Sequence, residues 1–70
     1  MTREEKISHN IQVIKRVVEA LLDQGLADKD KMLSNPAYAK EMFWSYITAA
    51  NIAREMMNMK PLVLYDISEN

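Results

Sequence analysis

Side chains suited to catalysis or metal binding are scarce in this sequence. The chain contains one histidine, His9, and no cysteine, so it lacks a thiol nucleophile, a thiolate zinc site and any disulfide. His9 has no carboxylate four residues further on, and a zinc site needs three or four converging ligands. We therefore predict no metal, no cofactor and a solvent-exposed imidazole.

Two pairs of neighbouring acids remain as candidates for acid–base chemistry, Glu4 with Glu5 and Asp28 with Asp30. Paired carboxylates act in catalysis where a walled cleft shifts one of their pKa values, and 70 residues leave little room for such a cleft. A helix N-terminus, where acids complement the macrodipole, accounts for the first pair, and a charged loop accounts for the second. The sequence also carries no phosphate-binding glycine loop, nucleophile elbow or H-E-x-x-H pattern. These features predict a protein that is not an enzyme.

Length and composition predict one small helical domain. The chain is 49% hydrophobic and 27% charged, with one glycine and two prolines, a low number of breakers for a turn-rich β fold. The net charge of −1 supplies no general attraction for nucleic acid or anionic membranes. The charged start lacks the apolar run of a signal peptide, and no stretch approaches the roughly 18 apolar residues of a membrane span. We expect a cytoplasmic protein with no membrane contact.

The first long helix is predicted over residues 3–24. Thr2 and Glu5 match a capping box, and Gly25 suits the position after a helix end, where positive φ is common. Between them, apolar residues recur at alternating steps of four and three, which places them on one side of a helix. We expect this apolar arc to face the core: Ile7, Ile11, Ile14, Val17, Val18, Leu21 and Leu22.

The second long helix is predicted from Pro36 to about Met59. Asn35 provides an N-cap and Pro36 suits the first helical position, whereas Pro61 cannot continue a helix. A short helical turn fits residues 28–33 in the linker. We expect residues 1–60 to form an antiparallel helical hairpin and residues 61–70 to form an extended tail.

The apolar arc of the second helix is wider than one neighbouring helix can cover. Helical geometry spreads its apolar residues over about 220°, and soluble monomers rarely leave such a surface exposed. We predict that two copies associate into a four-helix bundle. The alternative is that the tail folds back over the exposed part.

Two polar residues, Asn10 and Arg54, interrupt the apolar arcs of the two helices. An antiparallel hairpin would bring Asn10 level with residues near 51–54, so the amide and the guanidinium could satisfy each other as a buried polar pair. Such a pair would set the helix register. The alternative is that Arg54 forms the centre of an anion site.

Trp44 marks a candidate surface for binding a partner. It falls on the polar face of the second helix, and tryptophan is enriched at binding hot spots; the alternative is that the tail or the linker covers it. The candidate contact residues are Trp44, Lys40, Asn51, Glu55, Met59, Leu62, Leu64 and Tyr65. We predict a small accessory or regulatory protein that contacts a second copy of itself and an unidentified protein.

The alternative function is a small helical regulator that binds nucleic acid through the polar face of the first helix. Basic residues on that helix include Lys15 and Arg16. Glu5 and Glu19 dilute this charge, and major-groove readers need several basic or amide residues together. Nucleic acid is therefore the less favoured partner.

Overall fold

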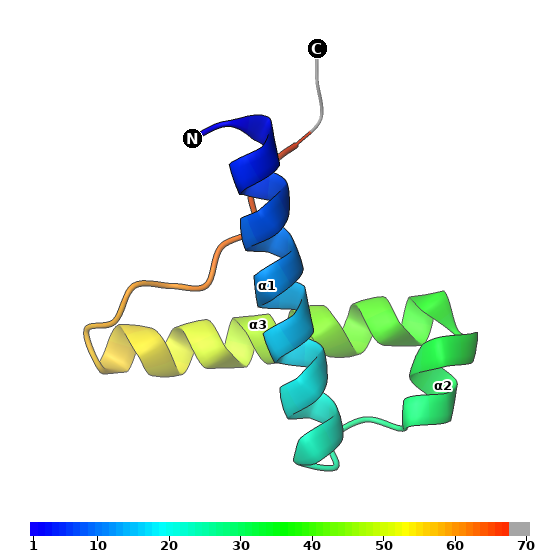
Figure 1. The fold of residues 1–70 in the computed structure, drawn as a ribbon. Coiled ribbons are helices and arrows are strands. Elements are labelled where there is room, and N and C mark those ends of the chain that lie inside the picture. The colour runs from blue at the N-terminus through cyan, green and yellow to red at the C-terminus, as the bar shows by residue number, and fades with distance from the viewer. Residues whose placement is uncertain (68–70) are drawn as a thin grey trace.

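The computed structural model describes residues 1–67, and this part of the chain contains three helices and no strand. They are α1 (Arg3–Asp23), α2 (Lys29–Ser34) and α3 (Pro36–Met56), as drawn in Figure 1. The predicted all-helical fold is confirmed, including the short helix in the linker. α3 ends three residues before the predicted end at Met59, and the last three residues of the predicted tail lie outside the described residues.

The helices begin where capping side chains satisfy backbone N–H groups that have no partner inside the helix. At α1, the Glu5 backbone N–H donates to the Thr2 hydroxyl (3.1 Å) and the Thr2 N–H donates to the Glu5 carboxylate (3.0 Å). At α3, the Tyr38 N–H donates to Asn35 Oδ1 (3.1 Å), directly before Pro36. The capping box and the N-cap predicted from the sequence are confirmed.

Both long helices end in a turn that contains one residue with left-handed backbone. After α1 this residue is Gly25, with φ of 67°, and after α3 it is Asn58, with φ of 57°. At the end of α3, the Met59 N–H donates to the Arg54 carbonyl (2.8 Å), which is the six-residue bond of a Schellman motif. Because Asn58 adopts this conformation, the chain leaves the helix early and turns back.

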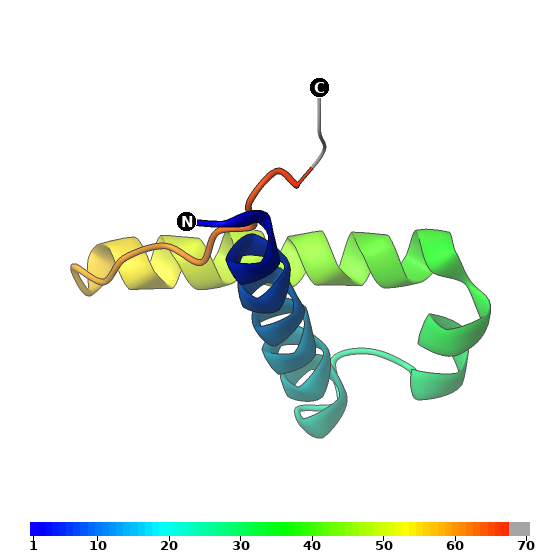
Figure 2. The ribbon, with the colours of Figure 1, turned by 45° about the horizontal axis from the view of Figure 1, so that its top comes forward.

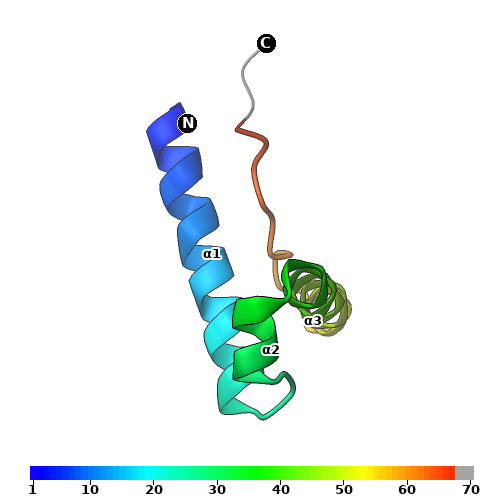
Figure 3. The same cartoon turned by 90° about the vertical axis from the view of Figure 1, so that its right-hand side faces the viewer.

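The two long helices cross steeply, as Figures 1 and 3 show. The linker that contains α2 carries the chain sideways before α3 begins, so α3 passes across α1 and does not run alongside it. This arrangement differs from the side-by-side antiparallel hairpin that we predicted. The helices consequently share one short contact region in place of a seam along their whole length.

The core is small and lies at this crossing. Val13, Val17 and Leu21 of α1 and Ile47 of α3 are buried. Partly buried hydrophobic residues surround them: Ala27, Met32, Met42, Phe43, Tyr46, Leu62 and Leu64. Of the predicted α1 arc, Val17 and Leu21 are in the core, and Val13, which is not part of that arc, joins them. Ile11 and Ile14 are instead 59% and 44% exposed, because the steep crossing uses one edge of the apolar arc.

The C-terminal segment turns back from the end of α3 and runs extended past α1, as Figure 2 shows. Leu62 and Leu64 pack against the core. This is the arrangement that the sequence left open as an alternative, in which the tail covers part of the apolar surface. Among the described residues, no helix has the length and apolar character needed to cross a membrane.

Candidate interaction surfaces

Two asparagine side chains hold the tail by its backbone. Asn51 Nδ2 donates to the Leu62 carbonyl (3.1 Å), and the Leu62 N–H donates to Asn51 Oδ1 (2.7 Å). Asn10 Nδ2 donates to the Tyr65 carbonyl (2.9 Å), and the Tyr65 N–H donates to Asn10 Oδ1 (2.9 Å). Each carboxamide therefore pairs with both backbone groups of one tail residue, as a neighbouring strand does in a sheet.

Further contacts hold the tail on either side of these bonds. His9 Nε2 lies 2.9 Å from the Val63 carbonyl oxygen, and the His9 ring packs edge-on against Tyr65 with centroids 4.8 Å apart. Arg54 Nη1 donates to the Lys60 carbonyl (3.0 Å). His9, predicted to be solvent-exposed, is partly buried against the tail.

The predicted pair of Asn10 with Arg54 is not the contact that the structure shows. Asn10 bonds to Tyr65 and Arg54 to Lys60, and both side chains are only partly buried. The steep crossing of the helices explains the difference, since it places the two residues beside different parts of the tail. Both polar residues nevertheless find hydrogen-bond partners, as partly buried polar groups generally do.

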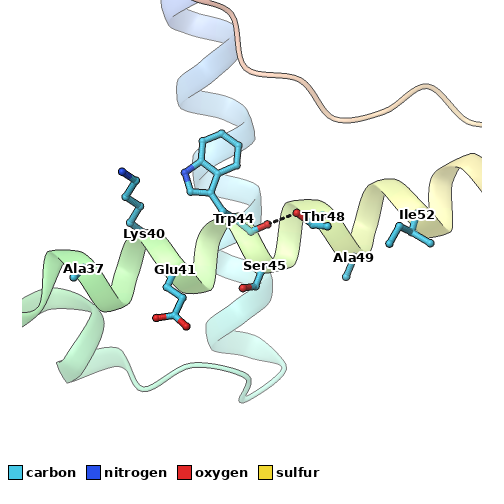
Figure 4. Close-up of a pocket in the computed structure, with 8 residues that line it drawn as sticks. All are labelled: Ala37, Lys40, Glu41, Trp44, Ser45, Thr48, Ala49 and Ile52. Atoms are coloured by element: carbon cyan, nitrogen blue, oxygen red, sulfur yellow. Dashed lines mark hydrogen bonds between the residues drawn. The ribbon is translucent and has the colours of Figure 1, made fainter.

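Trp44 lies at the meeting point of two open grooves on α3. Its side chain is 45% exposed, and its ring packs edge-on against Phe43 with centroids 5.1 Å apart. Figure 4 shows one groove on the side of α3 that faces away from α1, lined by Ala37, Lys40, Glu41, Trp44, Ser45, Thr48, Ala49 and Ile52. The other groove extends toward the end of α3 and includes Asn51, Glu55 and Met59. The structure thus places Lys40, Asn51, Glu55 and Met59, all predicted contact residues, along the grooves that meet at Trp44.

The remaining predicted contact residues serve the fold of the chain itself. Leu62 and Leu64 pack against the core, and Tyr65 is held by Asn10. Asn51 has two roles. Its amide holds Leu62, and the residue also lines the second groove, which begins at Trp44. In this conformation the inner side of the tail is therefore occupied.

In the described part of the chain, two apolar strips lie outside the core. The sequence predicts that the strip on α1 faces the core and that a second copy covers the strip on α3. The outer stripe of α1 comprises Ile7, Ile11, Ile14 and Val18, of which Ile11 and Ile14 are exposed. The outer face of α3 comprises Ala49, Ile52, Ala53 and Met56, all exposed, with Ile52 at 58% and Met56 at 82%. The four–three–four spacing of the outer stripe is that of a coiled-coil seam, which is the sequence signal that it could face another helix.

The Glu5 carboxyl has a shifted pKa, and the shift has a local cause. Hydrogen bonds from the Thr2 backbone N–H, and then from the Thr2 side chain, lower the pKa of the Glu5 carboxyl. This shift belongs to the helix cap. Within residues 1–67, no three acidic or histidine side chains converge to form a metal site.

Another molecule could contact the outer stripe, the outer face and the grooves at Trp44. Comparisons of the chain with protein-family models, curated proteins and solved structures found no significant match.

Proposed function

We propose that the chain is a small cytoplasmic accessory or regulatory protein, without catalytic activity, that acts through protein–protein contacts as a homodimer. The observation that carries this proposal is the outer stripe of α1. Ile11 and Ile14 are large apolar side chains on a regular helical spacing, and they are 59% and 44% exposed. Continuous apolar strips of this kind mark interaction sites in soluble proteins.

The size of the exposed surface leaves room for an interface with a partner. A compact monomer of 8.1 kDa exposes about 4,500 Å², whereas this chain exposes 5593 Å². Its radius of gyration is 13.3 Å, compared with about 11 Å for a compact domain of the same length. The surplus of about 1,100 Å² is in the range that one subunit contributes to a stable interface of standard or larger size.

The sequence of the outer stripe suits pairing with a copy of itself. β-Branched residues that repeat every three or four positions pack well against a second helix, and a two-fold dimer brings the same patch of each copy together. The outer face of α3 offers a second contact, because the small residues Ala49 and Ala53, exposed beside Ile52 and Met56, allow a neighbouring backbone to approach closely.

The grooves at Trp44 are the surface that we assign to a further protein partner. A half-exposed tryptophan combines a large apolar area with a polar N–H, which is why this residue is frequent at hot spots. Met59 lines the groove that runs from Trp44 to the end of α3 and is 47% exposed, and its flexible thioether adapts to different partners. Lys40 and Glu55 supply charges of opposite sign at the rim.

Replacing Ile11 with glutamate tests the dimer. We expect sedimentation equilibrium to show a dimer for the wild-type chain and a monomer for Ile11→Glu, with equal helicity in circular dichroism because Ile11 does not contribute to the core. Each Ile11 side chain buried at an interface contributes about 1.5–3 kcal/mol, so losing two should weaken the dimer by more than about a hundredfold.

The matched control is Gln12→Glu, which introduces the same side chain at the adjacent exposed position and should leave the dimer intact. A wild-type chain that stays monomeric at the highest concentration reached would contradict the proposal. A dimer that Ile11→Glu leaves unchanged would show that the outer stripe is not its interface.

A further inference from the structure

The connection between α3 and the tail, residues 57–61, is exposed to solvent. All five residues are exposed, Met57 at 63% and Met59 at 47%. Hydrogen bonds at this connection close the end of α3 and join Arg54 to the Lys60 carbonyl. None of these five residues is part of the buried core. We call residues 57–61 the hinge.

The hinge has a second conformation available to it. Asn58 adopts a left-handed backbone with φ of 57°, which is unfavourable for residues other than glycine, although asparagine tolerates it better than most. Methionine is a good helix former, and Pro61 is the first residue that cannot continue α3. We call the site where Asn10, Asn51 and the core hold the tail the tail groove, which is distinct from the grooves at Trp44. A helix extended through the hinge to about Met59, as the sequence predicts, would direct the tail away from the tail groove of its own chain.

The groove that receives the tail does not distinguish the tail of its own chain from that of another copy. Asn10 and Asn51 bind backbone atoms of Tyr65 and Leu62, and the core receives the side chains of Leu62 and Leu64. The tail of a second copy offers the same atoms in the same order. When two chains exchange tails, every groove is refilled and each contact is kept, which is what makes such exchange a low-cost route to dimers.

We infer that two copies of the chain exchange their tails, so that residues 62–65 of one copy are held by Asn10 and Asn51 of the other. The inference rests on the proposed self-association, because a tail tethered to its own groove has an effective concentration in the millimolar range. Contact between the outer stripes of two copies raises the local concentration of the foreign tail and offsets this advantage. The exchange thus adds a swapped segment to a dimer whose other contact is the outer stripe.

Cross-linking at the groove tests the exchange, since the chain has no cysteine of its own. The double variant His9→Cys, Tyr65→Cys places a thiol on each side of a contact whose ring centroids are 4.8 Å apart, and it keeps the asparagine bonds to the tail backbone. A short bifunctional maleimide then links the groove to whichever tail it holds. On a denaturing gel, a tail in its own groove gives a cross-linked monomer and an exchanged tail gives a cross-linked dimer.

Two substitutions at Asn58 in this background provide opposite controls at one exposed position. Asn58→Ala disfavours the left-handed turn and favours the extended helix, and we expect it to shift the exchange equilibrium toward the dimer by about five- to thirtyfold per hinge. Asn58→Gly removes the backbone cost of the turn, and we expect it to lower the cross-linked dimer fraction. That fraction should rise with protein concentration in each variant.

The outcomes separate the two proposals. If sedimentation shows a dimer while every variant gives only cross-linked monomer at all concentrations, the exchange is wrong and the dimer stands. If sedimentation shows a monomer throughout, both are wrong. A cross-linked dimer fraction that is equal in Asn58→Ala and Asn58→Gly would show that the hinge does not control the tail, and would overturn exchange through an extended α3.

Discussion

Asn10 and Asn51 hold the same extended segment at residues three apart, so their contributions to stability should depend on each other. Replacing either asparagine with leucine keeps the size of the side chain and removes two hydrogen bonds to the tail backbone. A hydrogen bond contributes about 0.5–1.5 kcal/mol net. Each single substitution should therefore lower the free energy of unfolding by about 1–3 kcal/mol.

The double substitution should cost less than the sum of the two single ones. Once the tail has left the groove, the second asparagine has no bond left to lose, so the total cost cannot exceed the free energy of tail docking. Neighbouring residues that share a partner show coupling energies of about 0.5–3 kcal/mol. We expect the shortfall of the double variant to fall in this range.

Urea unfolding followed by circular dichroism measures these costs, and amide hydrogen exchange reports on the tail itself. In the wild-type chain the Leu62 and Tyr65 amides should be protected although they lie in no strand, and Asn51→Leu should remove the protection of both. Gln12→Leu is the control, because it makes the same kind of change at an exposed position on α1 and should leave both readouts unchanged.

Two results would refute this reasoning. Costs of Asn10→Leu and Asn51→Leu that add within about 0.5 kcal/mol would show that the two asparagines act independently. Exchange of the Leu62 and Tyr65 amides at the rate of an unstructured peptide in the wild-type chain would show that the tail is not held in solution.

The remaining predictions concern the helix ends. Gly25→Ala should lower the free energy of unfolding by about 1–2 kcal/mol, measured by urea unfolding, because φ is 67° even though the added Cβ would meet no described atom within 4 Å. Thr2→Ala should cost about 1 kcal/mol in the same assay. Since folding lowers the pKa of Glu5, its contribution is present above the usual pKa of glutamate and is lost as the pH falls through the folded value. Glu5→Gln should remove that part of the pH dependence of helicity, followed by circular dichroism.

Capping residues were predicted correctly from the sequence because they act on backbone groups within a few positions. Thr2 and Glu5 form the two reciprocal bonds that their spacing predicts, and Asn35 accepts a bond from the Tyr38 N–H at the helix start that Pro36 occupies. The sequence predicts that α3 continues to about Met59 because Pro61 would end it. In the structure the helix ends earlier, at Met56, because Asn58 adopts a left-handed conformation. Local chemistry allowed both endings, and docking of the tail favours the earlier one.

The candidate surfaces were predictable in part. Helical geometry predicts Trp44 on the same face of the helix as Lys40, Asn51 and Glu55, and in the structure these residues line the two grooves that meet at Trp44. It did not reveal that Asn51 would hold Leu62, because that contact depends on where the chain goes after the helix ends. Asn10 and Arg54 were identified as polar residues in need of partners, but their partners were not.

The order of residues along the chain settled what depends on short-range chemistry: three helices, their first turns, and the periodic apolar residues of α1. The crossing of α1 and α3 determines which of these apolar residues form the core. It buries Val13, Val17 and Leu21 and leaves Ile11 and Ile14 exposed. Burial depends on which elements approach from elsewhere in the chain, and a periodic pattern carries no information about the direction of that approach. For the same reason, the position of the tail became visible only when the helices were placed in space.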